Sequence, residues 1–200
     1  RQAQQSAIIR NAHAVNLGMP PKLDANQGDF FFLCRRTPER LVQTVVELVK
    51  HRLPEKMGIA PEQIQVLSPT RKGETGTVQL NRALQAALNP PAPFKKEIIY
   101  GDTIFRLGDK VMHIKNNYQL PWQMDNGEEG VGVFNGDVGY ITKVDTQDRI
   151  VTVRYDEERT VEYDYQQLEE MELAYCLSVH KSQGSEFPCV VMPVLPGPPR

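Results

Sequence analysis

The stretch that decides the fold lies near the C-terminus and reads Leu177–Ser178–Val179–His180–Lys181–Ser182–Gln183–Gly184–Ser185–Glu186–Phe187–Pro188–Cys189. It separates two apolar, β-prone runs, residues 173–179 and 189–192. A polar loop between buried strands presents hydroxyls, cations and backbone N–H groups at one edge of a sheet, and such groups bind phosphates and sugars. The loop therefore predicts a nucleotide or nucleic-acid site.

Composition excludes several classes of protein. No apolar run is long enough to span a membrane and no secretory signal is present, so we expect a cytoplasmic protein without a membrane partner. The three cysteines, Cys34, Cys176 and Cys189, match neither a disulfide framework nor a zinc spacing. The first residue is Arg1 rather than Met, and we expect the chain to be a piece of a longer protein.

Charge is divided unevenly, although the formal net charge is only −2. Residues 1–100 carry 14 Lys and Arg against 8 Asp and Glu, whereas residues 101–200 carry 9 against 17. The division indicates two units, of which the first faces polyanions.

The first half of the chain alternates helix and strand patterns. We expect helices over residues 2–17, 37–54 and 77–88, with Pro54 ending the second, and buried strands over residues 29–33 and 64–67. This alternation of helices and strands predicts a parallel sheet, and loops at the carboxyl edge of such a sheet bind ligands. The loop at 68–76 has two glycines and two cations before a helix, which suits either an anion site or a solvated turn with a helix cap.

From Gly101 the pattern changes to short strands separated by turn residues. Strand-like runs cover residues 103–105, 110–114, 138–144, 150–155 and 160–163, and Trp122 lies in a linker between two of them. Close-spaced strands of this kind predict a small antiparallel barrel. The barrel is expected to interrupt the α/β sheet, which resumes near Leu173.

Several motifs together resemble one family, the RecD-type (exodeoxyribonuclease V alpha-like) superfamily-one DNA helicases. The resemblance spans nearly the whole chain in the right order. It rests on four segments: Arg1–Gln2–Ala3 with Ser6 and residues 8–13; Ser68–Pro69 with Lys72–Gly73, Gly76, Leu80–Asn81, Leu84–Gln85 and residues 88–90; residues 108–112, 116–118 and 134–139; and residues 173–175 with 179–187.

The resemblance implies an α/β fold of the P-loop NTPase type: a RecA-like parallel sheet, the second motor domain, interrupted by an SH3-like antiparallel β-barrel. The implied boundaries are residues 1–101 for the first part of the motor domain (2A), 102–168 for the SH3-like insert (2B), and 169–200 for the continued, truncated motor domain. The whole protein would be an ATP-dependent 5′-to-3′ DNA helicase in recombination and repair.

The resemblance also implies site residues. Arg1 matches an arginine that reaches the γ-phosphate and would be catalytic. Gln2, Gly184 and Glu186 would bind ATP, with Glu186 accepting from the ribose hydroxyl and Gly184 allowing close approach of the backbone. Residues expected to contact single-stranded DNA are Thr70, Arg71, Lys72, Asn116, Asn117, Tyr118, His180, Lys181, Ser182 and Gln183.

The resemblance implies ATP and Mg²⁺ as cofactors of the full-length enzyme, with neither bound tightly by this chain. Implied partners are single-stranded DNA, a first RecA-like domain of the same protein, and nuclease or helicase subunits. Two alternatives remain open. One is a non-catalytic nucleic-acid or protein-binding module built on an SH3-like barrel. The other is a fragment of a relaxase-type superfamily-one helicase.

We predict that this 200-residue chain does not hydrolyse ATP by itself. It contains no G-x-x-x-x-G-K-[ST] motif and no apolar strand ending in Asp–Glu, so it lacks a phosphate cradle and magnesium ligands. A phosphate-release assay with and without single-stranded DNA checks this, and DNA-stimulated turnover by the purified chain would contradict it.

We also expect weak binding of single-stranded DNA by this chain, because the binding channel is shared with an absent domain. Nanomolar affinity at physiological salt would contradict this expectation.

Overall fold

The computed structural model describes residues 6–24, 28–156 and 158–195. Its contacts divide the chain into two compact units, residues 1–37 and residues 38–200, which are described separately. Arg1 and Gln2, two of the expected ATP-site residues, lie outside the described residues.

The first unit is a capped helix with a returning segment. Helix α1 (Ala7–Asn16) begins after Ser6, whose side chain accepts a hydrogen bond from the backbone N–H of Ile9. Asp29 accepts from the N–H of Ala7 at 2.8 Å. Asn11 exchanges two hydrogen bonds with the backbone of Lys22. The segment after α1 is therefore held by polar side chains.

The expected strand over residues 29–33 is wrong. These residues form a turn and irregular backbone, and Phe31, Phe32 and Leu33 are 50%, 45% and 38% exposed. Asp29 is used to cap α1. Hydrophobic composition alone predicted a strand here, but no neighbouring strand pairs with the segment among the described residues.

The second unit opens with a long helical stretch made of α2 (Pro38–Glu47), a π-helical turn η2 (Leu48–Arg52) and α3 (Leu53–Met57). Pro54 does not end the helix as expected. Because Pro54 has no N–H, it removes one hydrogen bond, and the wider π-helical turn just before it shifts the bonding pattern so that the helix continues. The end comes at Gly58, which has the left-handed φ of 65°.

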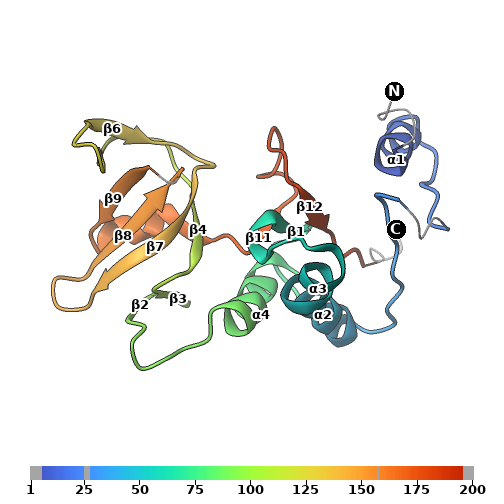
Figure 1. Ribbon diagram of the computed structural model, residues 1–200, viewed down its shortest axis with the longest axis horizontal. Helices are drawn as coiled ribbons and strands as arrows, with labels where there is room; N and C mark the ends of the chain where they lie inside the picture. The colour runs from blue at the N-terminus through green and yellow to red at the C-terminus, as the bar shows by residue number, and fades with distance from the viewer. Residues whose placement is uncertain (1–5, 25–27, 157, 196–200) are drawn as a thin grey trace. The chain divides into compact units, whose positions relative to one another are not determined.

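A three-stranded parallel sheet lies beside these helices (Figure 1). Its central strand β1 (Ile64–Ser68) follows the short turn η3 (Pro61–Gln63) and pairs in parallel with β11 (Cys176–Ser178) and β12 (Cys189–Val191). Helix α4 (Thr77–Leu88) runs back from β1 as expected. Asn81 on α4 bonds both the N–H and the carbonyl of Cys176 at 2.9 Å, so this helix occupies the outer edge of β11.

The chain between α4 and β11 forms the antiparallel part. A hairpin of β2 (Glu97–Tyr100) and β3 (Thr103–Arg106) precedes a seven-stranded sheet in the order β10-β4-β7-β8-β9-β5-β6. Its strands are β4 (Lys110–His113), β5 (Asn117–Met124), β6 (Glu129–Val133), β7 (Val138–Asp145), β8 (Ile150–Tyr155), β9 (Arg159–Tyr163) and, after the turn η4 (Gln166–Glu170), β10 (Met171–Leu173). The sheet curls on itself in Figure 1, consistent with a small SH3-like barrel. The expected α/β fold with an interrupting barrel is confirmed.

Two details of the barrel differ from expectation. The parallel sheet resumes at Cys176 rather than near Leu173, because Met171–Leu173 pairs antiparallel with β4. Trp122 lies within strand β5, not in a linker, and its ring covers Gly130 of the partner strand β6 so closely that a β-carbon there would lie 2.3 Å from it. The strand was not predicted because proline is rare inside strands and Pro121 lies in the middle of this one. A register shift in the β5–β6 pairing accommodates Pro121.

A polar chain crosses the interior of the barrel. The hydroxyls of Tyr155 and Tyr163 are 2.7 Å apart, and that of Tyr163 is 3.0 Å from Nδ1 of His113. All three side chains are buried, and burial lowers the pKa of His113 while Glu170 and Asp137 act in the opposite direction. Nε2 of His113 lies 3.6 Å from the carboxylate of Glu170.

Asp109 links the antiparallel part to helix α4 and to the linker before β11. This fully buried carboxylate accepts four hydrogen bonds, from the side chains of Gln85 (2.7 Å), Asn89 (2.8 Å) and Tyr175 (2.8 Å) and from the N–H of Arg106 (2.7 Å). These donors come from α4 and its C-terminal cap Asn89, from strand β3 and from the linker between β10 and β11. Burial raises the pKa of Asp109, and the hydrogen bonds oppose that rise. One side chain thus ties three segments together.

We predict that Asp109→Ala lowers the free energy of unfolding by about 3 kcal/mol or more, because it leaves several buried donors without an acceptor. Thermal and urea unfolding measure the change. The control Asp148→Ala removes an exposed aspartate in the turn between β7 and β8 and should change stability by no more than about 0.5 kcal/mol. Equal effects of the two substitutions would contradict the role of Asp109.

Candidate functional site

The two polar loops singled out in the sequence leave the parallel sheet side by side. In the β1–β11 pairing, Ser68 is aligned with Ser178, the last residue of each strand. The N–H of Val179 donates to the carbonyl of Ser68 at 3.1 Å, one step beyond the strands. Since the strands are parallel, the loop at 69–76 and the loop at 179–188 leave the same carboxyl edge (Figure 1).

The first loop is folded tightly against the start of α4. Ser68 donates from its hydroxyl to the carbonyl of Thr75 at 2.8 Å. The N–H groups of Thr77 and Val78 donate to the carbonyls of Thr70 (3.0 Å) and Arg71 (3.4 Å). A β-carbon on Gly76 would lie 2.5 Å from the carbonyl oxygen of Arg71, closer than side chains come. Only glycine permits this close return of the chain.

This fold decides between the two interpretations of the loop. Gly76, Thr77 and Val78 all donate their N–H groups to carbonyls within the loop, so these donors at the start of α4 are already used. The loop is therefore a turn that caps the helix, rather than a backbone cradle for an anion. Its side chains face solvent, because Thr70, Arg71 and Lys72 are all exposed.

The second loop is a chain of tight turns. Ser178 accepts through its hydroxyl oxygen from the N–H of Lys181 at 3.2 Å, and Ser182 donates from its hydroxyl to the carbonyl of Val179 at 2.8 Å. His180 and Gln183 are exposed, whereas Lys181 and Ser182 are half-buried. The hydroxyl of Ser182 thus supports the turn itself, and the exposed polar groups in these turns come from His180 and Gln183.

The residues expected to bind ATP follow in the same loop. Gly184 has a left-handed φ of 84°, which turns the chain after Gln183, and a β-carbon there would meet nothing within 4 Å. Glu186 is exposed two positions later. Their association with ATP stays a prediction.

A carboxylate that the sequence analysis missed lies between the two loops. Glu172 on β10 forms an ion pair with Arg71 at 2.9 Å and accepts a hydrogen bond from Lys181 at 3.2 Å, through a different oxygen for each. The barrel sheet therefore contacts both loops of the parallel sheet through one side chain. A signal was present in the sequence: Glu172 is the polar residue at the centre of an otherwise apolar, buried strand.

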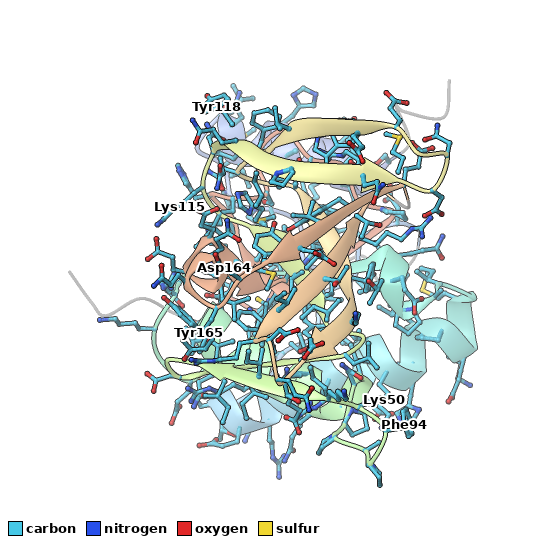
Figure 2. All side chains as sticks on the ribbon, turned by 90° about the vertical axis from the view of Figure 1, so that its left-hand side faces the viewer. Lys50, Phe94, Lys115, Tyr118, Asp164 and Tyr165 are labelled. Atoms are coloured by element: carbon cyan, nitrogen blue, oxygen red, sulfur yellow. The ribbon has the colours of Figure 1, made fainter. Side chains whose placement is uncertain are left out.

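The barrel presents the other expected DNA-binding residues. Tyr118 is 68% exposed, and its ring meets that of Phe134 edge-on at 5.7 Å. Figure 2 shows Tyr118 on the same side of the view as Lys115. Asn116 accepts from the N–H of Asn135 at 3.0 Å, so it fixes the turn that follows Phe134. Phe134 was not predicted as a site residue, although it opens the segment 134–139 that carries part of the family resemblance and directly precedes an Asn–Gly turn.

The third barrel residue, Asn117, is bonded to the turn before β10 and to its own strand. Its amide donates to Glu170 at 2.9 Å, and its oxygen accepts from the N–H of Gln119. Glu170 ends the turn η4 directly before β10, the strand that carries Glu172.

The described residues contain no group of three His, Cys, Asp or Glu side chains placed to hold a metal ion. Within the same residues, no helix has the length and apolar character needed to cross a membrane.

Two family models match the sequence. Residues 80–155 match the SH3 domain of ATP-dependent RecD-like DNA helicases, and residues 173–200 match the C-terminal domain of UvrD-like helicases. The first match covers most of the barrel strands and the second covers β11, β12 and the polar loop between them. The expected resemblance to RecD-type helicases is confirmed.

Curated relatives agree with these matches. The chain is 32% identical over 191 residues to the ATP-dependent RecD2 DNA helicase of Deinococcus radiodurans, an alignment that covers 96% of this chain and 23% of the relative. It is 31% identical over 147 residues to the uncharacterized protein MJ1519 of Methanocaldococcus jannaschii, covering 66% of this chain and 12% of the relative. The chain therefore spans less than a quarter of the length of either relative.

Among solved structures, similar chains include Pif1 helicases. A structure of two coordinating Pif1 helicases at forked double-stranded DNA gives a TM-score of 0.42 at 18% identity, covering 78% of this chain and 37% of that one. The Bacteroides Pif1 helicase in complex with ADP-AlF3 and ssDNA gives 0.42 at 17% identity, covering 78% and 39%.

We predict that Gly76→Ala disrupts the first loop, because the added methyl group collides with the carbonyls of Arg71 and Lys72, at 2.5 and 2.6 Å. The expected cost is about 1–3 kcal/mol of stability, together with weaker binding of a fluorescent oligo(dT). The control Lys72→Ala removes a cation without moving the backbone, so it should weaken binding and leave the melting temperature unchanged. A Gly76→Ala variant with wild-type stability would contradict this packing.

Proposed function

We propose that this chain, which carries a RecD-like helicase SH3 domain and a UvrD-like helicase C-terminal region, is the second motor domain of an ATP-dependent DNA helicase. In this proposal the motor moves 5′-to-3′ along single-stranded DNA in recombination and repair. The observation that supports it most strongly is the alignment of Ser68 with Ser178, which brings two polar loops to one sheet edge beside the barrel.

The DNA side of the proposal rests on charge and exposure. Arg71, Lys72 and Lys181 supply cations near one edge, and Thr70, His180, Ser182 and Gln183 supply hydrogen-bonding groups there. Cations of this kind bind phosphates regardless of base sequence. The exposed pair of Tyr118 and Phe134 supplies aromatic surface on which bases can stack, with Asn116 and Asn117 at its border.

The residues proposed to bind ATP lie in the second half of the second loop. We assign Gly184 and Glu186 to one wall of the ATP cleft, with Glu186 accepting from the ribose hydroxyl, and Arg1 and Gln2 to contacts with ATP from the N-terminal segment. A first RecA-like domain of the same protein would supply the phosphate cradle and the ligands of Mg²⁺. We also propose a cytoplasmic location and nuclease or helicase subunits as further partners.

The domain boundaries proposed are residues 1–101 and 169–200 for the motor domain and 102–168 for the insert, with strand β10 (Met171–Leu173) lying past the second boundary and completing the barrel sheet. Topology favours the motor over a free-standing binding module. Strand β1 precedes the barrel in the sequence and β11 follows it, yet the two pair in register in one sheet. A module carried at one end of a scaffold would not divide the scaffold's sheet in this way.

The binding test compares loop and barrel variants. Lys72→Ala should weaken binding of oligo(dT) and reduce the slope of log K against log salt by about 0.7, as expected for one lost phosphate contact. Tyr118→Ala should weaken binding with little change in slope, because stacking carries no charge. Fluorescence anisotropy at several salt concentrations measures both. Binding that is unaffected by either substitution would contradict the proposed DNA surface.

Polarity and ATP use are tested in a longer protein that contains this chain with its first motor domain. Such a protein should unwind a duplex with a 5′ single-stranded tail and not one with a 3′ tail. Glu186→Gln should raise the KM for ATP more than it lowers the turnover number. Unwinding only from a 3′ tail would overturn the proposed direction.

A further inference from the structure

Glu172 occupies an unexpected place for a carboxylate. It lies between two cations, Arg71 and Lys181, that the proposed function assigns to DNA phosphates. The side chains of Arg71, Glu172 and Lys181 are 65%, 32% and 26% exposed, so a polyanion can approach all three. A residue that merely completes the barrel strand would not need to contact both loops.

We infer that Glu172 is a phosphate-competing carboxylate, which holds Arg71 and Lys181 when DNA is absent and gives them up when a phosphate of single-stranded DNA arrives. This inference rests on the proposed function and adds to it a residue that lowers affinity. Its chemistry is an exchange of one oxyanion, a carboxylate, for another, a phosphate, on the same two cations.

The electrostatics of the three side chains support exchange rather than simple positioning. Two cations and one carboxylate leave a net charge of about +1 for an arriving phosphate, whereas the cations without Glu172 would offer +2. Ion pairs that water can reach contribute little to stability, so a phosphate can replace the carboxylate on these cations. Arg71 approaches the carboxylate through Nη1 at 2.9 Å, and its side chain remains 65% exposed, so a phosphate can reach the same guanidinium.

The backbone around Glu172 fixes which partner moves. Glu172 is aligned with Met112 in the β10–β4 pairing, and the neighbouring residues Met171 and Leu173 are buried. The carboxylate is therefore held near its place by the barrel. Arg71 and Lys181 are long, flexible side chains on turns, so they can rotate from the carboxylate to a phosphate nearby.

Such a carboxylate suits a protein that must release DNA as well as bind it. When a phosphate leaves, Glu172 is close enough to recapture both cations, which lowers the cost of separating them from DNA. Removing Glu172 should therefore strengthen binding. Under a purely positioning role, in which Glu172 orients the cations for DNA, its removal would weaken binding instead.

The test uses this chain and a fluorescein-labelled oligo(dT), with binding followed by anisotropy across a salt series. Glu172→Gln keeps the shape of the side chain and removes its charge. We expect the dissociation constant to fall about two- to fivefold at low salt, the range that corresponds to an exposed ion pair. The slope of log K against log salt should steepen by up to about 0.7.

Two controls separate this inference from other causes. Asp125→Asn also removes one negative charge, from an exposed ion pair with Arg154 on the barrel, and should leave binding unchanged. In a background that carries Arg71→Ala and Lys181→Ala, Glu172→Gln should have no effect, because no cations remain to be released. Circular dichroism and melting temperature verify that each variant is folded.

The outcomes are distinct. Unchanged or weaker binding by Glu172→Gln, or an equal gain from Asp125→Asn, would overturn the competing role while leaving the proposed DNA surface in place. A gain that persists without Arg71 and Lys181 would overturn it as well. If Arg71→Ala and Lys181→Ala together do not weaken binding of oligo(dT), both the inference and the proposed function fail.

Discussion

The parallel pairing of β1 with β11 is the constraint on which the rest of the structure depends. The two strands are separated by the whole barrel in the sequence, yet Val66, Leu67 and Ser68 align with Cys176, Leu177 and Ser178. Because their last residues are aligned, the loops that follow begin at the same level of the sheet. Any function that needs both loops requires this register, since a shift of one residue would turn each side chain to the opposite face.

Several polar groups hold that register across the barrel insertion. Asn81 bonds the backbone of Cys176 from α4, and Asp109 collects donors from α4, β3 and the linker before β11. Buried and satisfied polar networks of this kind fix one arrangement of segments that hydrophobic packing alone would leave variable. The insertion can thus be long without loosening the sheet. One hydrophobic cluster extends from Val45 and Leu84 in the helices to Val133 and Tyr163 in the barrel, and a second contains Leu67, Met112, Ala174 and Leu177.

The sequence predicted the elements with strong periodicity and failed where tertiary contacts decide. Strand β1 and helix α4 were predicted from their apolar residues and bounding Gly and Pro. The β5–β6 hairpin was missed, because Pro121 and Trp122 do not look like a strand until their partners are known. Pro54 appeared to end a helix that a π-helical turn allows to continue. The run at 29–33 is apolar, but pairing requires a neighbouring strand that its own sequence does not specify.

The candidate site, like the fold, could be predicted from the sequence only in part. The motif residues of the two loops could be recognised, and the parallel sheet explains why they lie together. What could not be predicted is that Glu172 contacts both loops and that Phe134 meets Tyr118, since these contacts depend on how the strands pair and where the loops fold back. Cross-linking of oligo(dT) carrying photoreactive thymidines, with the modified residues mapped by mass spectrometry, is the most direct test of a single continuous DNA surface. The account predicts cross-links in both loops, 69–76 and 179–188, and at Tyr118 or Phe134 in the barrel. Cross-links confined to helices α2 and α3, or to only one of the two loops, would contradict it.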